Sequence, residues 1–316
     1  MVKVAVLASF NMDLVMRAER RPGRGETLQG DFAMHLGGKG FNQAVAARRL
    51  GADVAVAGGV GDDEFGRMFL DALDREAIDR RAVIVEPTAG TGVASIIVEV
   101  DGTNSIVQAP RANRHVRAVD AASGDLLSGA GIALLQLETS GAGATAFADA
   151  ARRNGIPVLL NAAPAGMAHG PLLMKLTDVL VVNEIEASAL LGTASGARSP
   201  AGDEEAAACE LRRGGPRTVA ITLGERGVVA ADASGTVRAP AYEVSVVDTT
   251  GAGDAFCAAL AVALAEGGAL SDALRFASAA GALACTRAGA EPSMPHRDDV
   301  EALLRTGLLG QQERPR

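Results

Sequence analysis

Residues 248–254 read DTTGAGD and combine two carboxylates with a glycine-rich turn. The stretch lies between the apolar runs EVSVV and AFCAALAVALAE, and the second run predicts a helix that begins near Asp254. A helix start carries unpaired N–H groups and partial positive charge, and glycines let an anion approach them closely. Phosphoryl transfer needs such donors beside a carboxylate that accepts a hydroxyl proton. Asp254 could instead be a helix cap worth about 1 kcal/mol, but a cap explains neither the glycines nor the preceding Asp-Thr-Thr.

A second glycine-rich turn, LGGKGFNQA, spans residues 36–44. It is not a Walker A loop, because Gly40 follows Lys39 where Ser or Thr is required and no glycine lies five residues before Gly38. Lys39 and Asn42 lie three residues apart on one face of a predicted helix. The turn could serve a ligand or only the backbone, and taken alone it favours the backbone role.

Three further segments place polar residues just after apolar runs. Asn11 and Asp13 follow the first predicted strand, where open α/β sheets bind ligands, and they point to the same side; an Asx turn is the alternative. In NEIE, Glu186 lies one turn into the helix after Asn183, so it could hold Mg²⁺ through water or interact with the helix dipole. TLGERG, residues 222–227, could border a nucleotide or form a simple turn.

Other chemistries find little support. GAGATA, residues 141–146, fits the dinucleotide pattern G-x-G-x-x-A, but the next strand ends in Asn161 where an acid should meet the ribose. We therefore do not expect NAD binding or dehydrogenase activity. The four histidines lack metal-ligand spacing, and no G-x-S-x-G nucleophile elbow occurs.

The composition is acidic and free of tryptophan. The 316 residues carry a formal net charge of -8, with one tyrosine. This balance excludes binding to a nucleic-acid backbone, which needs clustered Lys and Arg, and it excludes base-stacking platforms. No apolar run reaches the ~18 residues of a membrane span. The three cysteines form no CxxC pair and are expected to be reduced, buried thiols. We expect a cytoplasmic protein.

The elements that must position these residues alternate between strands and helices. Short strands that are apolar on both faces, such as VKVAVLAS, DVAVAGGV and VLVVN, are separated by helices such as KGFNQAVAARRLG, which ends on Gly51. This alternation predicts one α/β domain over residues 1–316, a doubly wound, mostly parallel sheet covered on both faces.

Two segments interrupt this alternation. Residues 92–109 form two β-rich runs around Asp101-Gly102, a hairpin signal, and residues 14–35 show no helical period. We expect them to form a small inserted β-sheet lid, with boundaries near 12–36 and 92–110. GTVRA, residues 235–239, predicts another short hairpin.

Together these motifs resemble the ribokinase family of carbohydrate and nucleoside kinases, of the phosphofructokinase-B type. The resemblance covers about residues 3–305, with SFNMDLV, GGKGFNQAVAARRLGA, NEIE, TLGERG, VVDTTGAGDAF and TRAGAEPSMP in order. The Asn-Gln pair after GGKG and the PGET-like segment, interrupted by Arg24, are most similar to members that phosphorylate ribose. The resemblance implies transfer of the ATP γ-phosphate to a sugar hydroxyl, with D-ribose giving ribose 5-phosphate. It also implies Mg²⁺, a monovalent cation (usually K⁺) and a homodimer formed through the lid.

The resemblance further implies a role for each motif residue. Asp254 would be the general base, and the amides of Gly251, Ala252 and Gly253 the anion hole. The sugar-binding residues would be Asn11, Asp13, Gly38, Lys39, Asn42 and Glu138. The residues bordering ATP would be Asn183, Thr222, Gly224, Gly227, Gly253 and Ser278. Glu186 would help to place Mg²⁺, and the K⁺ site would comprise Asp248, Thr250, Ala284, Arg287, Gly289 and Ser293, several through carbonyls.

Two residues depart from the family pattern. Arg111 replaces a small residue near the lid, and we expect it to face solvent; an Arg at the sugar site would favour a phosphorylated or acidic substrate. Phe41 replaces a commonly small residue and is expected to pack in the core. The alternatives are a kinase for another sugar, a nucleoside or a phosphosugar, and, in another class, a non-catalytic sugar-binding or regulatory relative.

Overall fold

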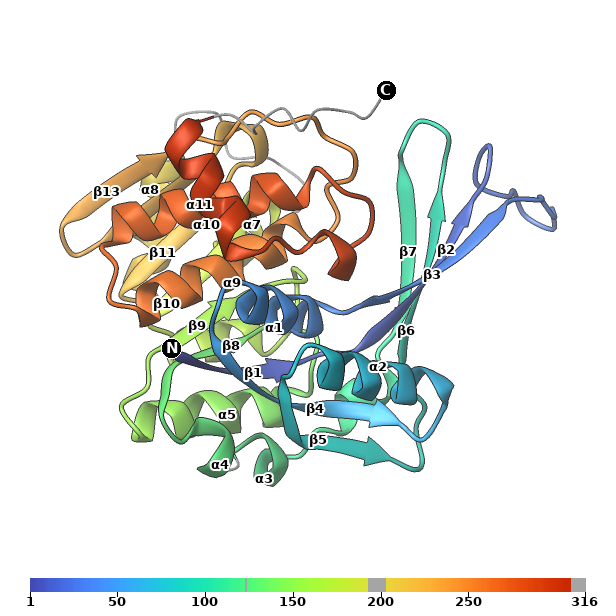
Figure 1. The fold of residues 1–316 in the computed structure, drawn as a ribbon, viewed down its shortest axis with the longest axis horizontal. Helices are drawn as coiled ribbons and strands as arrows, with labels where there is room; N and C mark the ends of the chain where they lie inside the picture. The colour runs from blue at the N-terminus through green and yellow to red at the C-terminus, as the bar shows by residue number, and fades with distance from the viewer. Residues whose placement is uncertain (123, 193–202, 308–316) are drawn as a thin grey trace.

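In the computed structural model, which describes residues 1–122, 124–192 and 203–307, the larger sheet has nine strands in the order β13-β12-β11-β10-β9-β8-β1-β4-β5 (Figure 1). Neighbouring strands from β5 to β11 run parallel, and β12 runs antiparallel to both of its neighbours, β11 and β13. The bounds are β1 Lys3–Ala8, β4 Asp53–Gly61, β5 Asp79–Glu86, β8 Ala130–Leu135, β9 Val158–Asn161, β10 Val179–Asn183, β11 Thr218–Thr222, β12 Val228–Asp232 and β13 Gly235–Ala239. The predicted parallel sheet and the hairpin at GTVRA are confirmed.

Helices cover both faces of this sheet. In β1, Val4 and Val6 point into one apolar core, whereas Ala5 and Leu7 point into another on the opposite face. The first core contains side chains of α1 (Lys39–Arg49), α2 (Glu64–Arg75), α9 (Ala252–Ala265), α10 (Leu270–Ala284) and α11 (Arg297–Thr306). The second contains side chains of α3 (Ala118–Ala121), α4 (Gly124–Leu127), α5 (Gly141–Arg153), α6 (Gly170–Met174), α7 (Glu184–Leu190) and α8 (Glu204–Arg213). The sheet is therefore doubly wound, as its two-faced apolar strands predict.

A smaller sheet extends beyond one end of the large sheet (Figure 1). Its order is β3-β2-β6-β7, with β2 Asn11–Arg17, β3 Asp31–Gly37, β6 Gly92–Val98 and β7 Asn104–Ala109. The strands β6 and β7 form the hairpin expected at Gly102, whose φ is 85°, and β2 pairs with β6 in parallel. The predicted second β-sheet is thus present, and it is built from two segments that are distant in the sequence.

Two local features of the first core follow from the sequence. Phe41 is fully buried and stacks edge-on against Phe69 at 5.0 Å between ring centroids, with Phe10 completing the cluster. The packing role expected for Phe41 is confirmed. Gly51, with a φ of 93°, follows Leu50, the C-cap of α1, as the predicted terminating glycine.

The apolar run EVSVV before DTTGAGD forms no strand. Val246 and Val247 are each 63% exposed, and the amides of Val247 and Asp248 both donate to the carbonyl of Cys285. Because this segment hydrogen-bonds to the end of α10, it does not extend the sheet, and DTTGAGD is preceded by a loop. Within the described ranges, every helix is too short or too polar to cross a membrane.

Candidate active site

The polar residues gather where the direction of strand succession reverses. From β1 the sheet continues through β4 and β5 on one side and through β8 and β9 on the other. Open α/β sheets bind ligands in the crevice at the carboxyl ends of strands at such a point. Here the segments after β1 and β8 meet the beginnings of α1 and α9.

Glu138, just after β8, links three of these segments. Its Oε2 accepts hydrogen bonds from Ser9 Oγ at 2.7 Å, the Lys39 amide at 2.9 Å and Asn11 Nδ2 at 3.4 Å. Its Oε1 accepts from Gln108 Nε2, at 3.1 Å, on strand β7 of the smaller sheet. Glu138 therefore joins β1, α1 and the smaller sheet at one carboxylate.

Glycine is required at Gly38 in this arrangement. Its φ is 95°, and a Cβ there would lie 2.6 Å from the carbonyl oxygen of Ser9. The GGKG turn thus brings the α1 backbone against the end of β1. The glycines therefore serve close backbone packing, the role that the turn favoured when taken alone. The same approach delivers the Lys39 amide to Glu138.

Asn11 and Asp13 lie on one face of β2, as expected from their spacing. Asn11 is 2% exposed and its Oδ1 accepts a hydrogen bond from Asn113 Nδ2 at 3.0 Å, so it belongs to a strand and not to an Asx turn. Burial, together with the charges of Glu138 and Asp254, raises the pKa of Asp13 to about 7, against the opposing charge of Lys39.

Asp254 is the third residue of α9 and is 7% exposed. Its Oδ2 accepts a hydrogen bond from Asn42 Nδ2 and its Oδ1 one from Gln43 Nε2, each at 2.9 Å. Burial raises the pKa of Asp254, while Lys39 and the two amides act in the opposite direction. The helix cap is Gly251, so the interpretation of Asp254 as a capping residue is wrong.

Lys39 is the cation of this cluster. Burial alone would lower the pKa of its ammonium group, but Asp254, Glu138 and Glu186 raise it, and the pKa lies above its ordinary value. Lys39 therefore stays charged and offsets part of the repulsion among the surrounding carboxylates.

The start of α9 presents backbone donors near Asp254. Gly251 has a φ of 80°, and a Cβ added at Gly253 would meet nothing within 4 Å, so this residue faces open space. The Ala252 amide donates to the Thr249 carbonyl at 3.3 Å. Of the three amides expected to hold an anion, that of Ala252 thus has a partner within the turn.

The residues expected to border a nucleotide lie at the ends of β10 and β11. Asn183 and Thr222 are register partners on these strands. Asn183 also caps α7: its Oδ1 accepts from the Glu186 amide and Glu186 Oε2 accepts from the Asn183 amide, both at 2.8 Å. The helix-start role of Glu186 is therefore real, and burial raises the pKa of its carboxyl, although the hydrogen bond from the Asn183 amide and the charge of Lys39 oppose this rise.

The TLGERG turn has one open glycine and one enclosed glycine. Nothing lies within 4 Å of a Cβ added at Gly224, whereas at Gly227 it would lie 2.2 Å from the Ala239 carbonyl oxygen. Gly227 thus permits close backbone packing, and Arg226 fixes the turn through Glu184 and Glu204. Ser278 is buried in α10.

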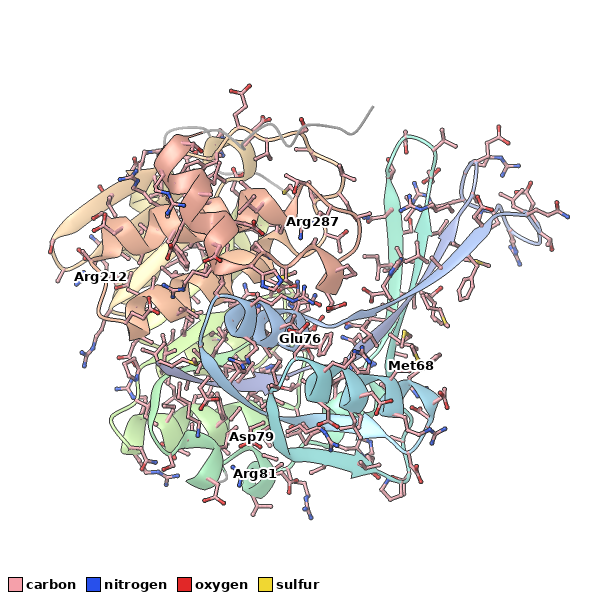
Figure 2. All side chains as sticks on the ribbon, in the orientation of Figure 1. Met68, Glu76, Asp79, Arg81, Arg212 and Arg287 are labelled. Carbon is pink, nitrogen blue, oxygen red and sulfur yellow. The ribbon has the colours of Figure 1, made fainter. Side chains whose placement is uncertain are left out.

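Part of the predicted K⁺ site comes together around Asp248. Its Oδ1 accepts from the Thr250 amide at 2.9 Å and the Thr250 hydroxyl at 2.7 Å, and its Oδ2 accepts from the Gly289 amide at 2.9 Å. Ala284 ends α10, and the Ser293 hydroxyl donates to the Ala290 carbonyl. Arg287 is exposed on the loop after α10 (Figure 2). In the described ranges, His, Cys, Asp and Glu side chains form no metal-binding group of three or more.

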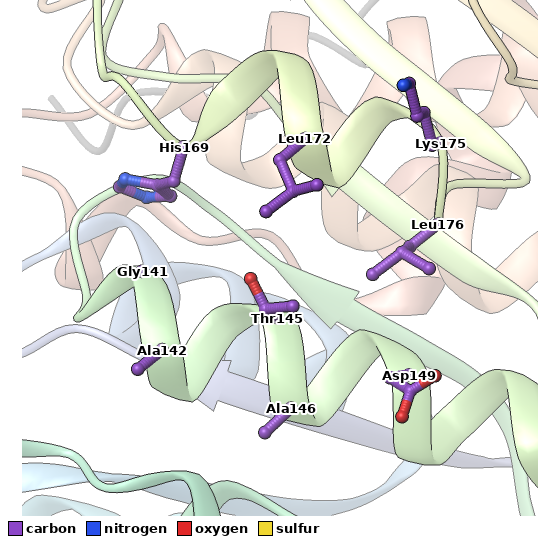
Figure 3. Close-up of a pocket in the computed structure, with 9 residues that line it drawn as sticks. All are labelled: Gly141, Ala142, Thr145, Ala146, Asp149, His169, Leu172, Lys175 and Leu176. Atoms are coloured by element: carbon purple, nitrogen blue, oxygen red, sulfur yellow. The ribbon is translucent and has the colours of Figure 1, made fainter.

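Arg111 and the GAGATA segment lie apart from this cluster. Arg111 is exposed and donates to the Thr91 carbonyl at 3.2 Å, which confirms the expectation that it faces solvent. The glycines of GAGATA open α5, where Ser140 caps the Gly143 amide at 3.0 Å. The surface cavity of about 750 Å³ between α5 and α6 is mostly apolar and includes none of the clustered polar residues (Figure 3).

Several residues of the cluster were not predicted from the sequence. They are Ser9, Gln43, Gln108, Asn113, Gln136 and Asn161. Ser9, Gln136 and Asn161 lie at the carboxyl ends of strands of the large sheet, and that position was the available signal for them.

Known proteins resemble the chain over nearly its full length. A model of the pfkB family carbohydrate kinases matches residues 1–297. The ribokinase of Bacillus subtilis (strain 168) is 38% identical over 311 residues, 96% of this chain and 100% of that protein. The deoxyribokinase of Salmonella typhi is 33% identical over 304 residues, 95% of this chain and 98% of that protein.

A solved structure shows the same similarity. Arabidopsis thaliana ribokinase complexed with ribose and ATP superimposes with a TM-score of 0.87 and 32% identity, over 96% of this chain and 98% of that chain. This agreement confirms the ribokinase-like fold. The chain belongs to the pfkB family of carbohydrate kinases, ATP-dependent phosphotransferases with an alcohol group as acceptor.

Proposed function

We propose that the protein phosphorylates D-ribose to ribose 5-phosphate at the expense of ATP. The observation that carries this proposal is the buried carboxylate of Asp254, which two side-chain amides hold at a helix start. Asp254 also interacts electrostatically with Lys39, Glu138 and Asp13. Relatives with ribokinase in their names, and one structure with ribose and ATP, support ribose as the sugar.

The sugar site is assigned to polar residues of β2, the start of α1 and the segment after β8. Asn11, Asp13, Lys39, Asn42 and Glu138 offer both donors and acceptors, which a polyhydroxyl substrate needs. Gly38 leaves the backbone room to approach. Neutral amides and carboxylates together can pair with hydroxyl groups in either direction.

In the reaction, Asp254 accepts the proton of the sugar hydroxyl. The hydroxyl oxygen forms a bond to the γ-phosphorus of ATP as the bond between this phosphorus and ADP breaks. The amides of Gly251, Ala252 and Gly253 would stabilise the charge on the transferring group, since helix starts favour anions. Lys39 would add positive charge on the same side. Asp254 needs only to be ionised and correctly oriented for this step.

The nucleotide is assigned to the edge formed by Asn183, Thr222, Gly224 and Gly227, and to Ser278 of α10. Glu186 fits Mg²⁺, because it is a hard oxygen ligand and its buried carboxyl lies within the electrostatic range of Lys39 and Asp254. Mg²⁺, when bound, neutralises charge on the phosphates. The Asp248 loop, rich in carbonyl groups, is assigned to K⁺, and hydrogen bonds from Thr250 and Gly289 keep the pKa of Asp248 low despite burial.

We also propose that the chain is a single cytoplasmic domain whose smaller sheet is a lid and a dimer interface. Side chains project from both faces of this sheet (Figure 2). On the face opposite Asn11 and Asp13, four apolar residues are exposed by 46% or more: Met16, Phe32, Met34 and Val107. Such a patch supports association, which sedimentation analysis would test.

The test is ADP release with Mg·ATP, with and without K⁺, across D-ribose, deoxyribose, other pentoses, fructose, nucleosides and sugar phosphates. We expect ribose to give the highest kcat/KM. Preference for deoxyribose would instead favour the activity named for the Salmonella typhi relative. If none of these compounds is phosphorylated, the result would favour a sugar-binding relative without catalytic activity.

The role of Asp254 has its own variant. Asp254→Asn should still bind ATP and sugar but lose about 10²- to 10⁴-fold in kcat, the usual contribution of a general base. Turnover near that of the wild type would remove Asp254 from this role. Binding is checked by calorimetry with ADP and with ribose.

A further inference from the structure

The carboxylate of Asp254 accepts a hydrogen bond from a chain of two buried amides, Gln43 and Gln136. The sequence motifs give neither residue a role. Gln43 Nε2 donates to Asp254 Oδ1 at 2.9 Å, and Gln136 Nε2 donates to Gln43 Oε1 at 2.6 Å. Gln43 is 0% and Gln136 1% exposed. The chain therefore runs from the end of β8, through α1, to the start of α9.

The amide of Gln43 is held from two strands. Besides accepting from Gln136 after β8, it donates through Nε2 to Asn161 Oδ1 at 3.1 Å, at the end of β9. Asn161 Nδ2 in turn donates to the Val181 carbonyl on β10. Gln43 cannot rotate without breaking these contacts, so its Nε2 remains directed at Asp254.

Packing does not account for Gln136. Its Oε1 is buried and lacks a hydrogen-bond partner among the described residues, and an unpaired buried acceptor is unfavourable. An apolar side chain of similar size would avoid this cost. The arrangement makes sense if the donor end of Gln136 is needed to orient Gln43.

We propose that Gln43 and Gln136 are positioning residues, a buried amide relay that fixes the plane of the Asp254 carboxylate for proton transfer. This inference rests on the proposed kinase function. Amides suit the task because they carry no charge: they orient the carboxylate and leave it basic, whereas an arginine partner would weaken it as a base. Asn42 holds the other oxygen from the same helix.

The test compares Gln43→Met and Gln136→Met with Thr139→Val in the full-length protein. Thr139 is 4% exposed, and its hydroxyl has no hydrogen-bond partner in the described part of the chain, so its variant controls for removing a buried polar group nearby. Gln43→Met should lower kcat about ten- to hundredfold, and Gln136→Met about three- to tenfold. KM for ATP should stay within about twofold in both, and Thr139→Val should match the wild type.

The pH profile separates positioning from a purely structural role. Loss of a donor to the ionised carboxylate should move the acid limb of kcat to higher pH in Gln43→Met. The charged groups facing Asp254 are Lys39 on α1, Glu138 after β8, Asp13 on β2, and Glu186 on α7, with the Cys257 thiol on α9, and all are unchanged in these variants.

A second readout is independent of turnover. The ¹³C carboxyl resonance of Asp254, identified by its loss in Asp254→Asn, should titrate at higher pH in Gln43→Met than in the wild type. If the wild type phosphorylates no sugar, the kinase proposal fails while this titration still decides the relay. An unchanged titration, or unchanged kcat in both folded Gln variants, would overturn the relay. If Gln43→Met does not fold, Gln136→Met serves as the test, because it keeps both hydrogen bonds to Asp254.

Discussion

Asp13→Asn should stabilise the ligand-free protein at neutral and alkaline pH. The pKa of Asp13 rises from 3.8 to about 7 in the folded state, chiefly because the side chain is buried and then because Glu138 and Asp254 are nearby. A carboxyl with a raised pKa binds its proton more tightly when folded. Its ionisation therefore costs stability, and the cost grows as the pH rises from about 4 to 7 and is constant above that.

The size of the effect follows from this difference. A rise from 3.8 to about 7, at about 1.4 kcal/mol per pH unit, corresponds to at most about 4 kcal/mol at pH 8. Asparagine has the same shape and no charge, so we expect Asp13→Asn to gain about 2–4 kcal/mol at pH 8 and little at pH 4. The variant should bind ribose more weakly, because it loses an acceptor for the sugar hydroxyls.

The assay is urea unfolding of both proteins between pH 4 and pH 9. Asp63→Asn is the control with the opposite sign: despite burial, hydrogen bonds from Thr91 and Gly66 lower the pKa of Asp63, so its contribution to stability is present above the unfolded pKa and is lost as the pH falls. A stability difference between Asp13→Asn and wild type that does not grow with pH would refute the reasoning.

Three further changes have defined outcomes. Phe41→Ala should lower the free energy of unfolding by about 3–5 kcal/mol, because it removes one ring of a fully buried cluster; urea titration would show a smaller loss if the cavity collapses. Arg111→Ala should leave KM for ribose within about twofold, since the side chain is exposed; a large increase would place it at the sugar. Arg226→Met should raise KM for ATP, because the TLGERG turn loses its contacts with Glu184 and Glu204; an unchanged KM would separate this turn from the nucleotide.

The fold could be predicted because apolar residues in strands such as VKVAVLAS occupy both faces. That pattern requires helices on both sides, and Val4 and Leu7 enter the two separate cores. EVSVV is also rich in valine, yet it stays outside the sheet. Composition describes what a segment can bury but not which partner its amides meet, and here that partner is the carbonyl of Cys285.

The site could be predicted in part for a similar reason. Asn42 and Asp254 belong to motifs whose glycines reveal close backbone approaches, so they could be identified. Gln136 is a single polar residue in an apolar run, Gln43 lies next to Asn42 in the GGKG segment, and nothing in either segment indicates that the two glutamines meet. Their roles depend on the pairing of β8, β1 and α1 in space.

The distance in sequence between Asp254 and its hydrogen-bond partners also determines when the site can first form during synthesis. Asp254 lies 212 and 211 residues after the two amides that hold it. At synthesis rates of ~5–20 residues per second, roughly 10–40 s pass between emergence of α1 and emergence of the base. During that interval the polar face of α1 stays hydrated, because its partner has not been translated. A nascent chain therefore cannot assemble this site before α9 has been synthesised.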